Sequence, residues 1–164
     1  MLQSNKRRKS RGFLIMEMLF GLVIAGIGIA AAISAYVMIS QLWKDDLVMN
    51  ELSRNANIGI EKMLHGSGGA LNTGLLAARD ITSPAPNAAA ANNVTYTDSA
   101  NVSRSFYYSG GKIVDLDNNE IVSNVDSVAF SYDGNNVLIA LALNKKSGKK
   151  EIELSVNTTV SPRN

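Results

Sequence analysis

The fold of this chain is decided by residues 6–43, KRRKSRGFLIMEMLFGLVIAGIGIAAAISAYVMISQLW. From Met18 to Trp43 this stretch contains 26 consecutive residues without a formal charge. At about 1.5 Å per residue, such a helix measures roughly 39 Å, which exceeds the ~30 Å hydrocarbon core of a bilayer. The stretch therefore predicts a membrane-spanning helix, with Trp43 at the boundary between lipid and water.

The basic charge of the chain is concentrated before this apolar run. Five of the 16 Lys and Arg residues lie within the first twelve positions, which contain no acidic residue. The whole chain carries a formal charge of +2, so the part after residue 12 carries −3. The positive-inside rule places the N-terminus in the cytoplasm and the remainder on the far side of the membrane. A positive charge confined to a short leader predicts no direct contact with nucleic acid.

The residue types that many enzymes and metal sites require are scarce. The chain has no cysteine and a single histidine, His65, which argues against a disulfide framework, a thiolate zinc site, a cysteine nucleophile and a histidine-rich metal site. Neither the GxSxG motif of serine hydrolases nor a phosphate-binding P-loop motif occurs. We therefore expect a protein that is not an enzyme, with no catalytic residue, cofactor or metal.

Glu17 departs from the pattern of a plain membrane anchor. It lies four residues after Phe13, where the apolar segment begins, and an unpaired carboxylate in lipid costs about 3 kcal/mol or more. Two arrangements would remove this cost. The carboxylate can reach back to the interface or to amides at the helix N-terminus. Alternatively, cleavage between Gly12 and Phe13 would create an α-amine that pairs with Glu17 of a neighbouring copy, and that pairing would build an assembly.

Residues 9–19, KSRGFLIMEML, together with the long apolar helix, resemble the N-terminus of the type IV pilin family, which includes the pseudopilins of type II secretion. The resemblance implies that a prepilin peptidase cleaves after Gly12 and N-methylates Phe13. It also implies that Glu17 neutralises the N-terminal amine of the adjacent subunit in the filament core. The chain departs from the family at Leu14, where a threonine or serine is usual.

The resemblance implies a structural subunit of a type IV pilus or pilus-like filament. A weaker resemblance of residues 106–113 and 124–133 to minor pilins and minor pseudopilins favours a minor subunit. The expected partners are other pilin subunits, the prepilin peptidase, the inner-membrane assembly platform and membrane lipid. We expect the precursor in a bacterial inner membrane, with its N-terminus cytoplasmic and its head outside, and the mature protein in a pilus or a periplasm-spanning filament.

Two alternatives stay open. One is a minor pseudopilin of a type II secretion system. The other belongs to a different class: a monomeric single-pass protein that binds a ligand or partner at the cell surface, with the apolar run as an uncleaved anchor. A conventional secretory signal peptide fits less well, because its apolar core spans about 7 to 15 residues. The sequence alone does not separate adhesion, motility, DNA uptake and protein export.

Five segments follow from these patterns. We predict a basic prepilin leader at residues 1–12, a transmembrane and assembly helix at 13–43, and an amphipathic continuation of that helix at 44–65. A variable loop is expected at 66–93, and an antiparallel sheet forms the head at 94–164. The long helix packed against the sheet makes the fold class α+β.

Beyond residue 43, apolar residues recur at every fourth position. This spacing predicts one continuous helix that ends at His65, before the glycine-rich residues 66–69. The stripe expected to face the sheet consists of Val48, Leu52, Ala56, Ile60 and Leu64.

From Val94 onward, apolar and polar residues alternate, as they do in strands. The predicted strands cover residues 102–108, 112–116, 120–123, 125–132, 137–143 and 151–156. Short turns rich in Gly and Asn separate them, which predicts an antiparallel meander. One face of this meander would pack on the helix, and the other would face water.

Two charged segments invite a binding function. Residues 115–126 place oxygen-bearing side chains at several positions of a calcium loop, but Glu120 stands where the loop requires glycine. We interpret this segment as a polar hairpin turn. The basic residues 145–150 are interpreted as a solvated hairpin tip, which protects a sheet edge from aggregation.

Overall fold

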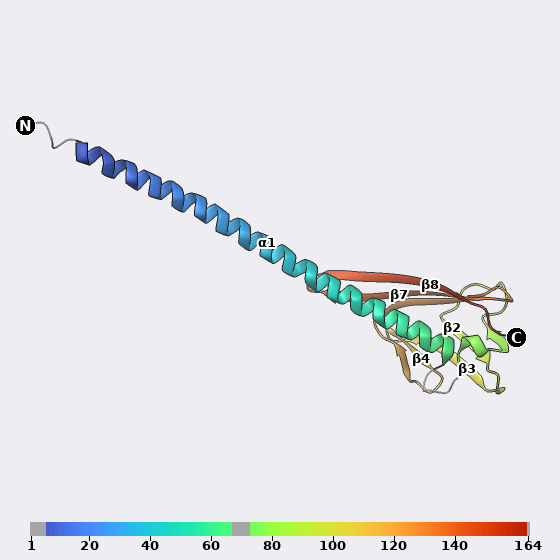
Figure 1. The fold of residues 1–164 in the computed structure, drawn as a ribbon. Helices are drawn as coiled ribbons and strands as arrows, with labels where there is room; N and C mark the ends of the chain where they lie inside the picture. The colour runs from blue at the N-terminus through green and yellow to red at the C-terminus, as the bar shows by residue number, and fades with distance from the viewer. Residues whose placement is uncertain (1–5, 67–72, 164) are drawn as a thin grey trace, which may run out of the picture. The chain divides into compact units, whose positions relative to one another are not determined.

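A computed structural model shows one long helix followed by a β-rich region (Figure 1). The structure describes residues 6–66 and 73–163, with side chains from residue 15 onward. Helix α1 spans Lys6–His65, and η1, a 3₁₀ turn, spans Leu75–Ala77. The chain divides into two compact units, Met1–Lys44 and Asp45–Asn164, which we call the anchor and the head. This boundary lies one residue from the predicted end of the transmembrane segment, and the predicted α+β class is confirmed.

The strands of the head form two antiparallel sheets. Their bounds are β1 Asp80–Ser83, β2 Asn93–Thr97, β3 Ser103–Ser109, β4 Lys112–Asp115, β5 Glu120–Val122, β6 Val125–Tyr132, β7 Val137–Ser147 and β8 Lys150–Val160. The first sheet has the order β1-β2-β3-β4-β5, and the second has the order β6-β7-β8. Neighbours in the sequence are therefore neighbours in each sheet, as a meander requires. All six predicted strands are present, and β7 and β8 are longer than predicted.

The division into two sheets differs from the single meander that the sequence predicts. The break falls after β5, where Asn124 adopts a left-handed conformation with φ 58°. Asparagine tolerates this conformation better than most residues, and it turns the chain out of the first sheet. The Val125 amide then donates to the Gly111 carbonyl at 2.9 Å, which fixes the start of β6 beside the β3–β4 turn.

The segment 66–93, predicted to be a variable loop, contributes part of the head's core. It contains η1 and β1, and β1 pairs with β2. Leu75, Ala78 and Ile81 are buried, and Ala91 forms a bridge with Phe130 of β6. The prediction was wrong for β1 because a four-residue strand with one buried apolar side chain shows no measurable alternation.

The head portion of α1 lies against both sheets along a stripe of small and apolar residues. Leu52, Ala56, Gly59 and Met63 are buried, whereas Ile60 and Leu64 are only partly buried. The stripe departs from the predicted one because each step of four residues rotates by about 40° around a helix with 3.6 residues per turn. At Gly59 the helix approaches β5 so closely that an added Cβ would overlap Val122 Cγ2.

The C-terminal end of α1 is fixed by glycine, as predicted. Gly66 has φ 105°, and its amide still donates to the Lys62 carbonyl at 2.8 Å. The chain then returns past the helix end at Gly74, where an added Cβ would overlap the Leu64 carbonyl. Residues 67–69 of the predicted glycine cap lie outside the described residues.

Candidate functional site: the apolar anchor helix

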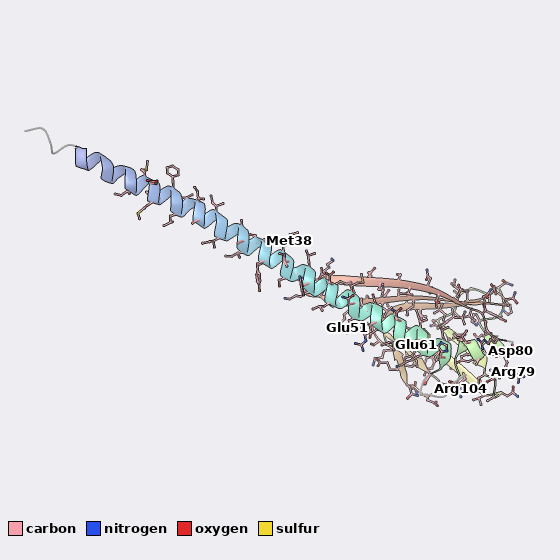
Figure 2. All side chains as sticks on the ribbon, viewed as in Figure 1. Met38, Glu51, Glu61, Arg79, Asp80 and Arg104 are labelled. Carbon is pink, nitrogen blue, oxygen red and sulfur yellow. The ribbon has the colours of Figure 1, made fainter. Side chains whose placement is uncertain are left out.

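The anchor presents an apolar surface from Ile15 to Trp43, interrupted by Glu17. Side chains project outward all around the helix, Met38 among them (Figure 2). The large apolar side chains from Ile15 to Trp43 are between 48% and 73% exposed. A continuous apolar surface of this size marks a membrane or protein contact. The helix is long and apolar enough to cross a membrane.

Glu17 lies on this apolar surface with its side chain exposed. The positions one turn away on the same helix are Phe13, Leu14, Phe20 and Gly21, and none of them carries a positive charge. Within the part of the chain whose side chains are described, no ion pair includes Glu17. The anchor therefore carries one carboxylate in apolar surroundings without a described cation beside it.

Gly12 and Phe13 lie within α1, and Phe13 precedes Glu17 by four positions, about one helical turn. Their side-chain environment lies outside the described side chains. Cleavage between them and methylation of Phe13 stay predictions.

The anchor also carries features that fit contact with another helix. A Cβ added at Gly21, Gly26 or Gly28 would meet nothing within 4 Å. The packing of the described chain therefore does not require glycine at these positions, whereas close approach between membrane helices favours it. Ser34 donates its hydroxyl to the Ala30 carbonyl at 2.9 Å, which satisfies a polar group inside the apolar run.

Among the described residues of the head, Asp98 is the one buried polar or charged residue, and sequence reasoning missed it. Its side chain is 1% exposed, and its carboxylate accepts hydrogen bonds from the backbone amides of Ala100 at 2.9 Å and Val102 at 3.0 Å. Arg104 Nε donates a third at 3.0 Å. The bond from the Val102 amide, followed by that from Arg104, lowers the pKa of Asp98. These contacts fix the β2–β3 turn, and Asp at the start of a turn was the available signal.

The basic hairpin tip between β7 and β8 is mostly exposed, as predicted, and it also contacts α1. Lys145 pairs with Glu51 of α1, and Lys150 Nζ lies 3.2 Å from the Asp45 carboxylate. The Ser147 hydroxyl donates to Asp45 at 2.6 Å, and this bond, with Lys150, lowers the pKa of Asp45. The contact with α1 could not be foreseen because Asp45 and Ser147 are 102 positions apart.

The calcium-like segment is a hairpin turn, as interpreted. Asp115 accepts hydrogen bonds from the backbone amides of Asp117 at 3.0 Å and Asn119 at 2.8 Å, so its carboxylate closes the β4–β5 turn. Among the described residues, no group of three or more His, Asp or Glu side chains is placed to hold a metal ion.

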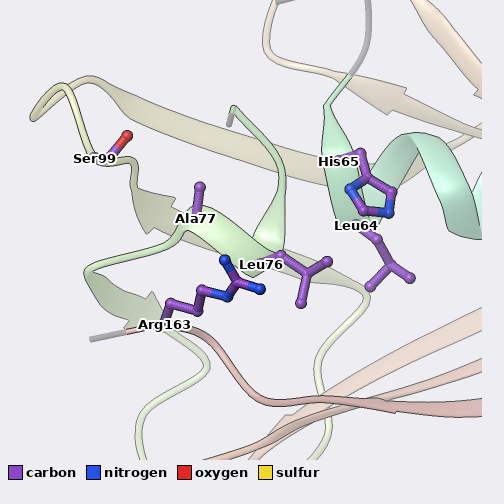
Figure 3. A pocket seen from close by; sticks show the side chains of 6 residues that line it. All are labelled: Leu64, His65, Leu76, Ala77, Ser99 and Arg163. Carbon is purple, nitrogen blue, oxygen red and sulfur yellow. The ribbon is translucent and has the colours of Figure 1, made fainter. Parts of the chain in front are cut away.

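An open pocket of about 300 Å³ lies beside the C-terminal end of α1 (Figure 3). Its lining consists of Leu64, His65, Leu76, Ala77, Ser99 and Arg163. Arg163 extends toward Leu76, and its backbone amide donates to the Leu76 carbonyl at 3.1 Å. The lining joins two basic side chains to one hydroxyl and three apolar groups. His65 stands in the last turn of α1, where a basic residue favours the helix end.

No family model, curated protein or solved structure matches the chain.

Proposed function

We propose that the protein is a prepilin-like structural subunit that is cleaved between Gly12 and Phe13 and assembles through its apolar helix. The product is a type IV pilus or a pilus-like filament, in which this chain serves as a minor subunit. It does no chemistry of its own. A prepilin peptidase and an inner-membrane assembly platform act on it, and other pilin subunits surround it in the filament.

The observation that carries this proposal is Glu17. A carboxylate that remained alone in lipid would cost about 3 kcal/mol or more, and nothing one turn away on its own helix offsets that cost. The α-amine of a mature N-terminus at Phe13, supplied by a neighbouring subunit, has the charge and the depth in the membrane to pair with it. Pairing between copies would therefore make the assembled state more stable than a single helix in lipid.

The remaining surface of the anchor supports the same proposal. A bundle of such helices would cover the exposed apolar side chains with each other after they leave the lipid. Gly21, Gly26 and Gly28 would let neighbouring helices approach closely, because nothing in the described chain fills the space beside them. The leader, with five of the chain's 16 basic residues, orients the precursor with its N-terminus in the cytoplasm.

The proposal is tested in cells that have a prepilin peptidase and assembly machinery. Mass spectrometry of the membrane form should find a mature chain that starts at N-methylated Phe13. A Glu17→Gln variant should be processed normally, yet its incorporation into sheared filaments should fall at least roughly hundredfold. The substitution leaves the neighbouring subunit's α-amine at Phe13 as an unpaired charge in the filament core, which costs about 3–5 kcal/mol. Glu61→Gln is the matched control, because Glu61 is an exposed glutamate of the same helix within the head.

Two outcomes would overturn the proposal. An intact leader beginning at Met1, in cells whose peptidase processes other substrates, would favour the uncleaved single-pass surface protein. Normal incorporation of the Glu17→Gln variant would show that the carboxylate does not pair between subunits. If neither outcome is seen, deletion of the gene separates the two kinds of subunit: loss of piliation indicates a pilus subunit, and loss of secretion indicates a pseudopilin.

A further inference from the structure

The hairpin tip between β7 and β8, residues 145–150, lies beside the first residues of the head portion of α1. Lys145 of β7 pairs with Glu51 of α1. Ser147, two residues closer to the turn, donates its hydroxyl to Asp45 at 2.6 Å. Each step toward the turn therefore moves toward the N-terminal end of the head, and β8 begins there, at Lys150 (Figure 1).

The residue that the hairpin tip contacts comes directly after the apolar segment of α1. This segment, residues 13–43, has 31 residues and measures roughly 46 Å as a helix, close to the ~40–45 Å of a bilayer with its headgroup layers. A segment that fills the bilayer in this way sets Trp43 at the outer headgroups and Asp45 about 3 Å beyond it. The hairpin tip, held at Asp45 by Ser147 and Lys150, would then lie beside the lipid headgroups.

Two of the four lysines in the hairpin tip have no acidic partner within the part of the chain that the structure describes. Lys146 and Lys149 are exposed and take part in no described ion pair, whereas the other two lysines pair with acids of α1. Lys44 and Asp46 offset each other in the sequence, and Glu151 lies opposite Lys146 across the hairpin. Lys149 stands at the turn itself, so the tip presents a positive charge at its outermost point.

Lysines at this level are placed to attract the phosphates of lipids. Each basic residue near an anionic membrane surface favours contact by about fivefold, and the attraction extends over a Debye length of about 8–10 Å. The flexible four-carbon stem of lysine lets the ammonium group follow a mobile phosphate. Because α1 already holds the hairpin tip beside the membrane, the contact is in effect intramolecular and needs little affinity of its own.

We propose that the hairpin tip docks, through Lys146 and Lys149, on the headgroups of anionic phospholipids in the membrane that holds α1. The contact holds the head at the membrane surface while the subunit is in lipid, and it is lost when the subunit leaves the lipid. The proposal rests on α1 as a membrane anchor. It needs neither cleavage after Gly12 nor pairing of Glu17 with another copy.

The absence of cysteine makes this contact measurable in the full-length chain. A Glu151→Cys variant, labelled with the fluorophore NBD, reports from an exposed position beside the hairpin tip. One copy is placed in each lipid nanodisc, made of phosphatidylcholine alone or mixed with phosphatidylglycerol, and some lipids carry a nitroxide on the headgroup. Quenching of NBD by the nitroxide should be at least roughly threefold stronger in the anionic nanodiscs, and added salt should reduce it.

Three double variants with the same label test which charges are responsible. Lys146→Gln with Lys149→Gln should lose most of the preference for anionic lipid, whereas Lys146→Arg with Lys149→Arg should keep it. Arg79→Gln with Arg163→Gln removes the same charge at the other end of the head portion of α1 and should also keep the preference. Arg163 lines the pocket there, and Arg79 follows its Ala77 by two residues; both arginines are exposed.

Trp43, the single tryptophan, reports on the anchor, because the same nitroxide lipids should quench it equally in all unlabelled variants. Equal NBD quenching in neutral and anionic nanodiscs would overturn the proposal. So would a preference that survives the glutamine substitutions at Lys146 and Lys149, or an equal loss in the arginine control. These results do not depend on processing and leave the filament proposal to its own test. A Trp43 that the nitroxide does not reach would instead remove the membrane anchor that both proposals need.

Discussion

A Gly59→Ala substitution tests how closely α1 approaches the first sheet. The added Cβ would overlap Val122 Cγ2 and lie 3.2 Å from Val122 Cβ. Val122 is 2% exposed and β-branched, so its side chain has little freedom to move aside. Overpacking of this kind costs about 1–3 kcal/mol, whereas replacing glycine by alanine in a helix gains about 1 kcal/mol. The expected net change is a loss of about 1 kcal/mol in the head's free energy of unfolding.

The sign of this effect should reverse when the obstacle is removed. In a Val122→Ala background the space opens, and Gly59→Ala should stabilise the head by about 1 kcal/mol, which gives a coupling of about 2 kcal/mol between the two sites. Hydrogen exchange of β7 amides measures the head alone, whatever the anchor helix contributes to other signals. Asn57→Ala, at an exposed position of the same helix, controls for helix propensity. If Gly59→Ala alone stabilised the head by as much as in the Val122→Ala background, the close approach would be refuted.

The remaining predictions concern the polar contacts of the head and use the same exchange assay. Asp98→Ala leaves three donors without their carboxylate and should lower the head's free energy of unfolding by about 3 kcal/mol. Arg104→Ala removes only one of the three bonds and should lower it by about 1 kcal/mol. Equal losses in the two variants, or a comparable loss in an Asp126→Ala control, would contradict this prediction. The folded-state pKa of Asp98 lies below its ordinary value of 3.8, so the stability that its carboxylate contributes is complete above that pH and is lost as the pH falls through the folded pKa. The head should therefore become less stable below pH 3.8, and the Asp98→Ala variant should show a smaller decrease. Tyr96→Phe removes the hydroxyl that donates to the Thr73 carbonyl at 2.7 Å and should cost about 1 kcal/mol, and no change would show that water replaces this bond.

The sequence was sufficient for α1 because its signals are local and repeated. An apolar run of the right length, an amphipathic continuation and a glycine at position 66 each lie within a few turns of one another, and each indicates the same helix. Most strands were also predictable, since β7 and β8 alternate between more and less buried positions over eight or more residues. The bounds of β6 were predicted without error.

What the sequence did not predict depends on contacts between distant segments. The second sheet arises from the backbone conformation of Asn124, and β1 is recognisable only from its pairing with β2. The Asp45 contacts of the hairpin tip join positions more than a hundred residues apart. The candidate site, in contrast, could be identified without knowledge of such contacts. Glu17 was identified from the sequence because a charge in an apolar run needs no tertiary information to be conspicuous.

The two places where the head holds α1 have a mechanical consequence. Near Asp45 the helix is held by a hydroxyl and an ammonium group, and near Leu64 it is held by the backbone returning at Gly74. Tension that enters along the helix from the anchor reaches the polar contacts first, and these can break and re-form in water at small cost. The buried residues from Leu52 to Met63 then bear the load in shear. Under such a tension, the polar contacts at Asp45 would give way before the buried contacts nearer the C-terminal end of α1.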